Sequence, residues 1–363
     1  LKLPFSARPC FGYRPVHWCA RTFVRWNGSG EGGWDTCGAM GTSCTVPSVD
    51  VPACECAIGG ALPVQRTRLR VGGVPTVYDA PLQFALSQGK YAGLDVNLNW
   101  VKCPRDTGAV VSMLTAGLLD LAFLFAEDAV AYSASGALRI CGTFVETPRE
   151  WGLHVPSAVQ SQTSADLDSY AIGLPDDIGA SLMLQILAER PGWGQLARVQ
   201  TKRYNSVRRA EEAVCRDLAQ SVLWEKRAAS GLVDCGEWDI VHAQPMPWPS
   251  LLMVATKESV YSKGGAIRHF IEFARNTCME FKENKDMESA RFLLRFGMVE
   301  KDACAWLGET TWSCKCEVEE NALLELLRRL EAGGHMPCGR IADPMRLIAR
   351  DLVTLVLAAG GAG

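Results

Sequence analysis

Two acidic residues stand where a side chain could contact a small ligand. Glu127 directly follows the apolar segment 120–125 and opens a helical pattern, and Glu225 follows a short apolar run that ends in Trp224. A carboxylate at either place can accept hydrogen bonds from the donors of a ligand. The alternative for Glu127 is purely local, because a carboxylate at a helix N-terminus is electrostatically favourable whatever else it does.

Two tryptophans could pack against the ring of such a ligand. Trp248 lies between Pro247 and Pro249, and Trp151 follows the Thr147-Pro148 pair. Flanking prolines hold a segment extended, so a tryptophan there has little freedom to lose on binding. Its face suits a flat aromatic or cationic group. The alternative is that each tryptophan simply fills the hinge between two parts of the chain.

The segment Ile178-Gly179-Ala180-Ser181 opens a further helical pattern. Small residues such as Gly179 and Ser181 expose backbone N–H groups, which is an arrangement that binds anions. Here, however, Asp176 and Asp177 come directly before it. An aspartate can cap the helix through the same N–H groups, and two acids repel an anion. A neutral or cationic ring is therefore at least as plausible a ligand as an anion.

Tyr78 and Asp79 follow the first strand pattern, at a place where a loop could reach a ligand. The histidines offer no pair at the spacing of metal ligands. Cys54-x-Cys56 lacks a second pair, and Cys314-x-Cys316 has irregularly spaced neighbours. The sequence also lacks a nucleophile elbow and a P-loop. We therefore expect no metal, no cofactor and no catalytic residue.

Alternating strand and helix patterns must position these residues. From residue 66, strands at 69–72, 94–101, 120–124 and 138–144 alternate with helices at 82–88, 107–116 and 126–135. The pattern restarts after residue 160, with strands at 170–173, 197–202, 220–223 and 238–242 and helices at 178–189 and 207–216. A strand at 251–255 and helices at 267–281, 288–296 and 317–332 follow. Such alternation is typical of parallel α/β units, and its restart predicts two α/β lobes with a cleft between them.

Composition narrows the classes of partner. The chain has 363 residues, 48% of them hydrophobic and 21% charged, and a net charge of −3. This favours a globular protein and gives no basic patch for nucleic acid. No apolar run is long enough to span a membrane. The 15 cysteines are odd in number and scattered, which suggests free thiols in a reducing compartment.

Residues 1–65 differ from the rest of the chain. They are basic and free of acids up to Gly30, then rich in glycine and cysteine, and they lack periodicity. An organelle transit peptide or an unstructured extension would explain this composition. We therefore expect an intracellular protein, cytoplasmic or organellar. The oligomeric state stays open.

Two sets of residues resemble a known family. Leu69-Arg70-Val71-Gly72-Gly73 through Gly93-Leu94-Asp95-Val96, together with Gly117-x-x-Asp120-x-Ala122, resemble the type 2 periplasmic-binding-protein group. That group includes nitrate-, sulfonate- and taurine-binding proteins and thiamine-pyrimidine-precursor synthases. An ordered series resembles an intracellular eukaryotic branch of that fold: Ala126-Glu127, Thr147-Pro148-x-x-Trp151, Trp224-Glu225, Gly236-Glu237 and Pro247-Trp248-Pro249-Ser250.

The resemblance implies a bilobal α/β fold joined by two crossover segments, with hinge closure over a ligand. Lobe I would comprise residues 66–163 and 247–335, lobe II residues 164–246, and the C-terminal tail residues 336–363. Ser250 joins the expected ligand contacts, which are then Tyr78, Asp79, Glu127, Trp151, Gly179, Ser181, Glu225, Trp248 and Ser250. The expected function is binding of a small, polar, ring-containing solute.

Two other functions stay open. The synthases of this family use a lysine to hold pyridoxal phosphate, a histidine as a source of atoms and a cysteine cluster for iron. On the resemblance, the lysine position falls on Leu124 and the histidine position on Asp128, and the cysteine cluster is missing. An aliphatic side chain cannot form a Schiff base, which argues against that enzyme. The third possibility, the binding component of an ABC transporter, would need an export signal or a lipid-anchoring cysteine, and neither is evident.

Overall fold

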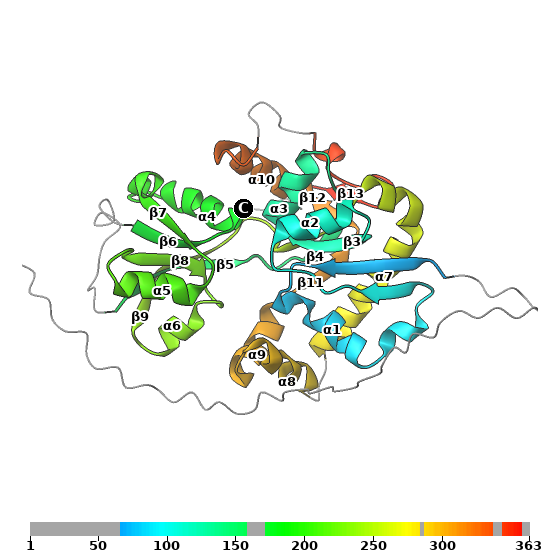
Figure 1. The fold of residues 1–363 in the computed structure, drawn as a ribbon, viewed down its shortest axis with the longest axis horizontal. Coiled ribbons are helices and arrows are strands. Elements are labelled where there is room, and N and C mark those ends of the chain that lie inside the picture. The colour runs from blue at the N-terminus through cyan, green and yellow to red at the C-terminus, as the bar shows by residue number, and fades with distance from the viewer. Residues whose placement is uncertain (1–65, 158–170, 284–286, 337–342, 358–363) are drawn as a thin grey trace, which may run out of the picture. The chain divides into compact units, whose positions relative to one another are not determined.

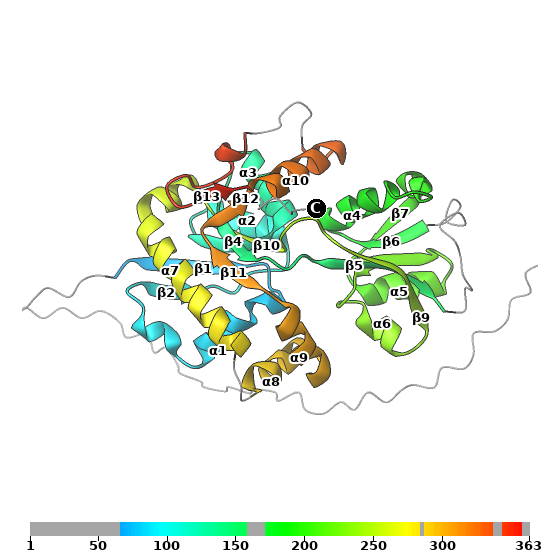
Figure 2. The same ribbon diagram turned by 180° about the vertical axis from the view of Figure 1, so that it is seen from behind.

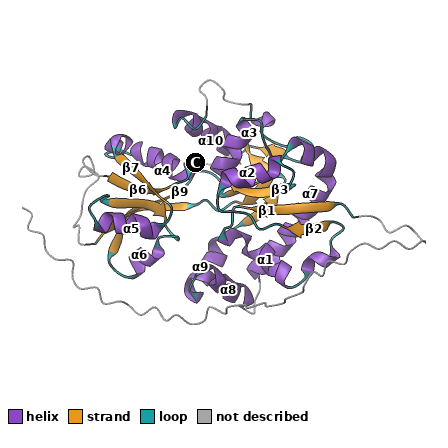
Figure 3. Ribbon diagram, in the orientation of Figure 1, coloured by secondary structure: helices purple, strands orange, loops and turns teal. Residues whose placement is uncertain are grey.

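The computed structural model describes residues 66–157, 171–283, 287–336 and 343–357. Residues 1–65, which the sequence analysis treats as an N-terminal extension, lie outside them. The described residues build two large β-sheets with helices on both faces, and a further sheet of two short strands (Figure 3). The predicted α/β architecture is confirmed.

The first sheet has six strands and is mixed, with both parallel and antiparallel pairs. Their spatial order is β11 (Trp312–Lys315), β4 (Arg139–Val145), β10 (Leu251–Ala255), β3 (Leu121–Phe125), β1 (Arg68–Gly73) and β2 (Asn97–Trp100). Strand β1 pairs in parallel with β2 and β3, whereas β10 runs antiparallel between β3 and β4. The carboxyl ends of β1, β2 and β3 therefore share one edge, which is where loops of such sheets bind ligands.

The second sheet has five strands in the order β7 (Gln200–Tyr204), β6 (Ala171–Pro175), β8 (Ser221–Glu225), β5 (Glu150–Pro156) and β9 (Trp238–Pro245). Strand β6 pairs in parallel with β7 and β8, and β5 pairs antiparallel with β8 and β9. The carboxyl end of β6 leads into Asp176 and Asp177, and that of β8 ends at Glu225.

Helices cover both faces of each sheet (Figure 1). On the second sheet, α4 (Ile178–Ala188) lies on the face opposite α5 (Val207–Cys215) and α6 (Ser230–Asp234). On the first sheet, α2 and α3 lie opposite α1, α8 and α9 in both views. The bounds are α1 (Ala80–Ser87), α2 (Thr107–Thr115), α3 (Ala126–Ala134), α7 (Lys257–Glu283), α8 (Glu288–Leu293), α9 (Glu300–Glu309) and α10 (Glu320–Ala332).

Two segments connect the sheets and run side by side (Figure 2). The first, residues 146–149, leads from β4 to β5, and the second, residues 246–250, leads from β9 to β10. The backbone N–H of Met246 donates to the carbonyl of Arg149 at 2.9 Å, and that of Ser250 donates to the carbonyl of Val145 at 3.1 Å. These paired crossovers form a two-stranded hinge.

Three details differ from the sequence-based expectations. Strand β5 belongs to the second sheet, so the boundary between the sheets lies at residues 146–149 and not after residue 163. Residues 317–319 form a short strand, β12, before α10, and β12 pairs with β13 (Thr354–Val356). Part of the expected tail therefore packs on the first lobe, where Ile348 also bridges to Ile140 of β4.

Candidate functional site

Arg149, at the end of the first crossover, lies between the two sheets. One guanidinium nitrogen, Nη2, is 3.1 Å from Oε1 of Glu127 in the first lobe, and the other, Nη1, is 3.6 Å from Oδ2 of Asp177 in the second. The guanidinium also lies over the rings of Phe125 and Trp151, 4.1 and 5.1 Å from their centroids. A single buried cation thus contacts carboxylates and aromatic rings from both lobes.

Surrounding carboxylates keep this arginine charged despite its burial. Burial alone would lower the pKa of Arg149, but the negative charges of Glu127, Asp177 and Glu225 outweigh it and raise the pKa. The Arg149 side chain is only 4% exposed. A buried charge is tolerable only with such partners, because removing it from water costs several kcal/mol.

Glu127 and Gly179 complete the contacts of Arg149. The indole Nε1 of Trp248 donates a 3.0 Å hydrogen bond to the same Glu127 oxygen that meets Arg149. Gly179, in the first turn of α4, lies against the pair: a Cβ there would collide with the guanidinium and lie 3.1 Å from Oε1 of Glu127. Only glycine allows the helix to approach this closely. Helix α4 is therefore positioned by the charged pair it covers.

A pocket of about 480 Å³ is lined from both lobes beside Arg149's partners. Its wall combines loop and helix-start residues that follow β1, β2, β3 and β6. They are Val74, Arg105, Asp106, Thr107, Gly108, Phe125, Asp128, Tyr132, Asp176, Asp177, Ile178, Ser181 and Arg203, with His335 beyond α10.

Three helices begin at this pocket. The caps of α2 and α4 are Asp106, which accepts from Ala109 N–H, and Asp177, which accepts from Ala180 N–H. The capping role expected for Asp177 is confirmed.

Asp128 is the most perturbed acid of the pocket wall. Its Oδ2 accepts a hydrogen bond from the Thr107 hydroxyl at 3.2 Å. Burial, followed by the charges of Glu127 and Asp177, raises the pKa of Asp128 to about 7, although Arg149 and Thr107 oppose the rise. Perturbed carboxylates of this kind are typical of functional sites.

Four of the residues expected to contact the ligand come together around Arg149: Glu127, Trp151, Gly179 and Trp248. Trp151 and Trp248 are 1% and 3% exposed and lie outside the pocket wall, so in this structure they contact Arg149 and Glu127 and not the pocket. Glu225 is close enough to raise the pKa of Arg149, and burial raises its own pKa.

The remaining expected residues have separate positions. Ser181 lines the pocket and accepts a hydrogen bond from Arg203. Ser250 lies in the hinge, where its hydroxyl donates to the carbonyl of Thr147. Tyr78 is buried against Trp306, and burial and Glu225 raise its pKa to about 12.

Asp79 faces a different pocket. It lines a cavity of about 440 Å³ between α1, the loop after β2 and α8, together with Trp100, Cys103 and Phe292. Burial raises the pKa of Asp79 to about 7, and its Oδ1 has no hydrogen-bond partner. The loop that carries Asp79 thus follows β1 as expected, but this side chain does not reach the pocket between the lobes.

Sequence reasoning did not identify Arg149, Phe125 or Arg203 as site residues, and it discussed Asp128 only as the histidine position of the synthases. The one available signal was the placement of Arg149 within the Thr147-Pro148-x-x-Trp151 segment.

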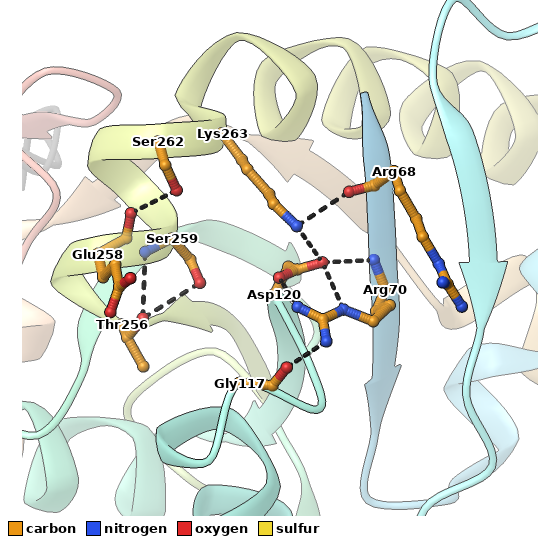
Figure 4. A network of polar contacts seen from close by, with 9 residues as sticks. All are labelled: Arg68, Arg70, Gly117, Asp120, Thr256, Glu258, Ser259, Ser262 and Lys263. Carbon is orange, nitrogen blue, oxygen red and sulfur yellow. Dashed lines mark hydrogen bonds and ion pairs between the residues drawn. The ribbon is translucent and has the colours of Figure 1, made fainter. Parts of the chain in front are cut away.

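The Gly117-x-x-Asp120 segment serves the framework. Asp120 accepts hydrogen bonds from the backbone and side chain of Arg70, and its Oδ2 lies 2.9 Å from Nζ of Lys263 (Figure 4). Arg70 also donates to the carbonyl of Gly117. This network ties β1, the start of β3 and α7 together at the edge of the sheet opposite the pocket.

The described residues do not fit the cofactors of the synthases. Leu124, at the expected lysine position, is a fully buried aliphatic side chain in β3. Within the described ranges, no group of three or more His, Cys, Asp and Glu side chains could hold a metal ion. No disulfide joins any two of the eight cysteines in these ranges. None of the described helices is long and apolar enough to cross a membrane.

Two sheets joined by a double crossover, with a pocket between them, define the periplasmic-binding-protein fold, and solved structures agree. The CA3427 gene product of Candida albicans, which defines a family with this generic fold, matches with a TM-score of 0.64 and 21% identity. The match covers 80% of this chain and 97% of that one.

Two sulfonate-binding proteins named SsuA are also similar. The aliphatic sulphonate binding protein of Escherichia coli has a TM-score of 0.63 and 15% identity, covering 79% of this chain and 99% of its own. The alkanesulfonate-binding protein of Xanthomonas axonopodis pv. citri, bound to MOPS, has a TM-score of 0.58 and 15% identity, covering 81% and 100%. No family model and no curated protein matches the sequence. At these identities the likeness establishes the fold.

Proposed function

We propose that this chain is a solute-binding protein that closes its two lobes on a small, polar, ring-containing molecule. The observation that carries the proposal is the pocket that both lobes line, with Arg149 beneath it contacting Glu127 from one lobe and Asp177 from the other. Residues that meet across two lobes do so only when the lobes are together, so a ligand there would favour closure.

Unused polar atoms support a binding role. Oε2 of Glu127, Nε of Arg149 and Nε1 of Trp151 are buried and have no hydrogen-bond partner. Leaving such groups unpaired costs about 1–3 kcal/mol each. None of the three residues lines the pocket in this structure, so a polar ligand would recover part of that energy only if the lobes shift to expose these atoms. The half-buried ring of Phe125 on the pocket wall offers a face for the ring of the ligand.

The hinge supports closure. The two crossovers are short and hydrogen-bonded to each other, so a small rotation there moves the lobes as rigid bodies. Exposed contacts farther out also join the lobes: Arg329 of α10 forms two bonds to Glu189 after α4, at 2.9 and 3.0 Å. Such exposed pairs contribute about 0.2–1 kcal/mol and can break on opening.

A pocket-filling variant tests the proposal. The full chain would be heated with and without the small-molecule fraction of its host's cells. A ligand present at 100 times its Kd adds about 2.7 kcal/mol, which raises the melting temperature by several degrees. Ser181→Trp, which fills the pocket, should abolish the rise. Ser262→Trp, on an exposed face of α7, should keep it. An equal rise in both variants, or none in the wild type, would contradict the proposal.

A further inference from the structure

We propose that the molecule held between the lobes is a small organic cation and that Asp128 receives its positive charge. This inference rests on the proposed function and adds the chemical class of the ligand. It follows from an inventory of the charges that face the pocket and of the partners each one already has.

Acidic side chains outnumber basic ones on the pocket wall, and one of the two arginines, Arg203, already donates hydrogen bonds to protein atoms. The acids there are Asp106, Asp128, Asp176 and Asp177, and the guanidiniums are Arg105 and Arg203. Arg203 donates to the carbonyls of Pro175 and Asp177, at 2.7 and 3.1 Å, and to the hydroxyl of Ser181. His335 adds no charge at neutral pH, because burial and Arg203 lower its pKa. The wall therefore carries an excess of negative charge.

The residues around Arg149, next to the pocket wall, also carry more negative than positive charge. Arg149 contacts Glu127 and Asp177 and also feels the charge of Glu225, so one guanidinium faces three carboxylates. Oε2 of Glu127, a side chain that is 2% exposed, has no partner. Arg149 already pairs with two other carboxylates, and its charge only partly offsets the rise in the pKa of Asp128.

The side-chain hydrogen bond of Asp128 comes from a neutral hydroxyl and not from a positively charged group. Its hydrogen-bond donor is Thr107 from α2, and the acids Glu127 and Asp177 repel it. Such a carboxyl binds a proton near neutral pH, as the rise in its pKa to about 7 indicates. A ligand cation next to Asp128 would replace that proton, so binding would release it to solvent.

The neighbouring ring suits a cation as well. Phe125 lines the same pocket and already carries the guanidinium of Arg149 4.1 Å from its centroid. Planar cations with a delocalised charge bind both a carboxylate and an aromatic face. We therefore assign amidinium-, guanidinium- or protonated aminopyridine-type groups to this site.

Three matched probes test the charge: benzamidine, benzamide and benzoate, which differ mainly in being cationic, neutral and anionic. Titration calorimetry on the full chain should show benzamidine binding at least about ten-fold more tightly than benzamide, with benzoate weakest. The affinity of benzamidine should fall roughly ten-fold from pH about 8 to pH about 6, because Asp128 takes up a proton over that range.

Paired variants isolate Asp128. Asp128→Asn keeps the shape and the bond to Thr107 but removes the charge, so benzamidine should lose its advantage over benzamide and its pH dependence. Asp95→Asn removes an exposed charge before the amino end of β2 and should change neither. Equal or tighter binding of benzamide or benzoate, unchanged selectivity in Asp128→Asn, or binding of none of the three at millimolar concentration would overturn the cation assignment. None of these outcomes decides the proposed function, because the pocket-filling test with Ser181→Trp does not use the three probes.

Discussion

Arg149 and Glu127 form a buried ion pair at the junction of the two sheets, with 3.1 Å between Nη2 and Oε1 and side chains only 4% and 2% exposed. The two residues come from different structural settings: one ends a crossover segment, and the other opens α3. Their pairing connects the hinge to the pocket wall, since Asp128 follows Glu127 directly and Phe125 lies under the guanidinium.

Replacing Arg149 should destabilise the fold strongly. Arg149→Met leaves Glu127 and Asp177 near an apolar side chain, and breaking a buried pair in this way costs about 3–5 kcal/mol. Urea denaturation would measure the loss. The double variant Arg149→Met with Glu127→Gln should recover a large part of it, because no unpaired buried carboxylate remains at Glu127. A loss below about 1 kcal/mol in the single variant would argue against the buried pair.

Gly179 should not tolerate a methyl group. In Gly179→Ala the new Cβ collides with the guanidinium of Arg149, so either the pair or α4 must shift. We expect a loss of about 1–3 kcal/mol in unfolding free energy. Gly231→Ala, in α6, has open space around it and should be neutral or stabilising by up to about 1 kcal/mol. Similar effects of the two substitutions would rule out the close contact.

His154 should make the fold sensitive to mild acid. Burial lowers the pKa of this fully buried histidine from 6.5 to about 4. Its folded pKa lies below its unfolded one, so the unfolded state binds the proton first as the pH falls. The stability is then complete above pH about 6.5 and declines by up to about 3 kcal/mol towards pH 4.

A leucine substitution checks this origin of the pH dependence. His154→Leu should flatten the unfolding free energy between pH 6.5 and 4, whereas His269→Leu, on the exposed side of α7, should leave the slope as in the wild type. An unchanged slope in His154→Leu would assign the acid sensitivity to other groups.

Asp120→Asn should affect stability and leave binding alone. Asp120 is buried and paired with Arg70 and Lys263, and these bonds lower its pKa despite burial, which acts in the opposite direction. Loss of the charge should cost about 2–4 kcal/mol at neutral pH, and less as the pH falls below the carboxyl's usual range. Calorimetry with benzamidine should give the wild-type affinity, and a large change would place Asp120 in the site.

The sequence predicted the scaffold well because its signals are local. Apolar strands such as Leu121–Phe125, followed at once by a helix, fix the α/β repeat and place Glu127 at the carboxyl end of a strand. The Pro-Trp-Pro segment likewise predicted that Trp248 lies in a connection between lobes. The position of β5 was not predictable in this way, because sheet membership depends on pairing with β8 and β9, which lie far along the chain.

The site was less predictable because its main group depends on distant partners. An arginine after a proline has the sequence signature of an exposed turn, and Arg149 is buried only because Glu127, Asp177 and Glu225 converge on it. Asp79 shows the converse: its loop was placed correctly, but the side chain turns towards α8 and not towards the other lobe.

Native mass spectrometry of the full chain purified from its own host would test the central claim most directly. The account predicts one small molecule per chain, which denaturation releases for identification, and its absence from the Ser181→Trp variant. A covalent pyridoxal adduct, or the same molecule bound equally to Ser181→Trp, would contradict a solute-binding pocket between the lobes.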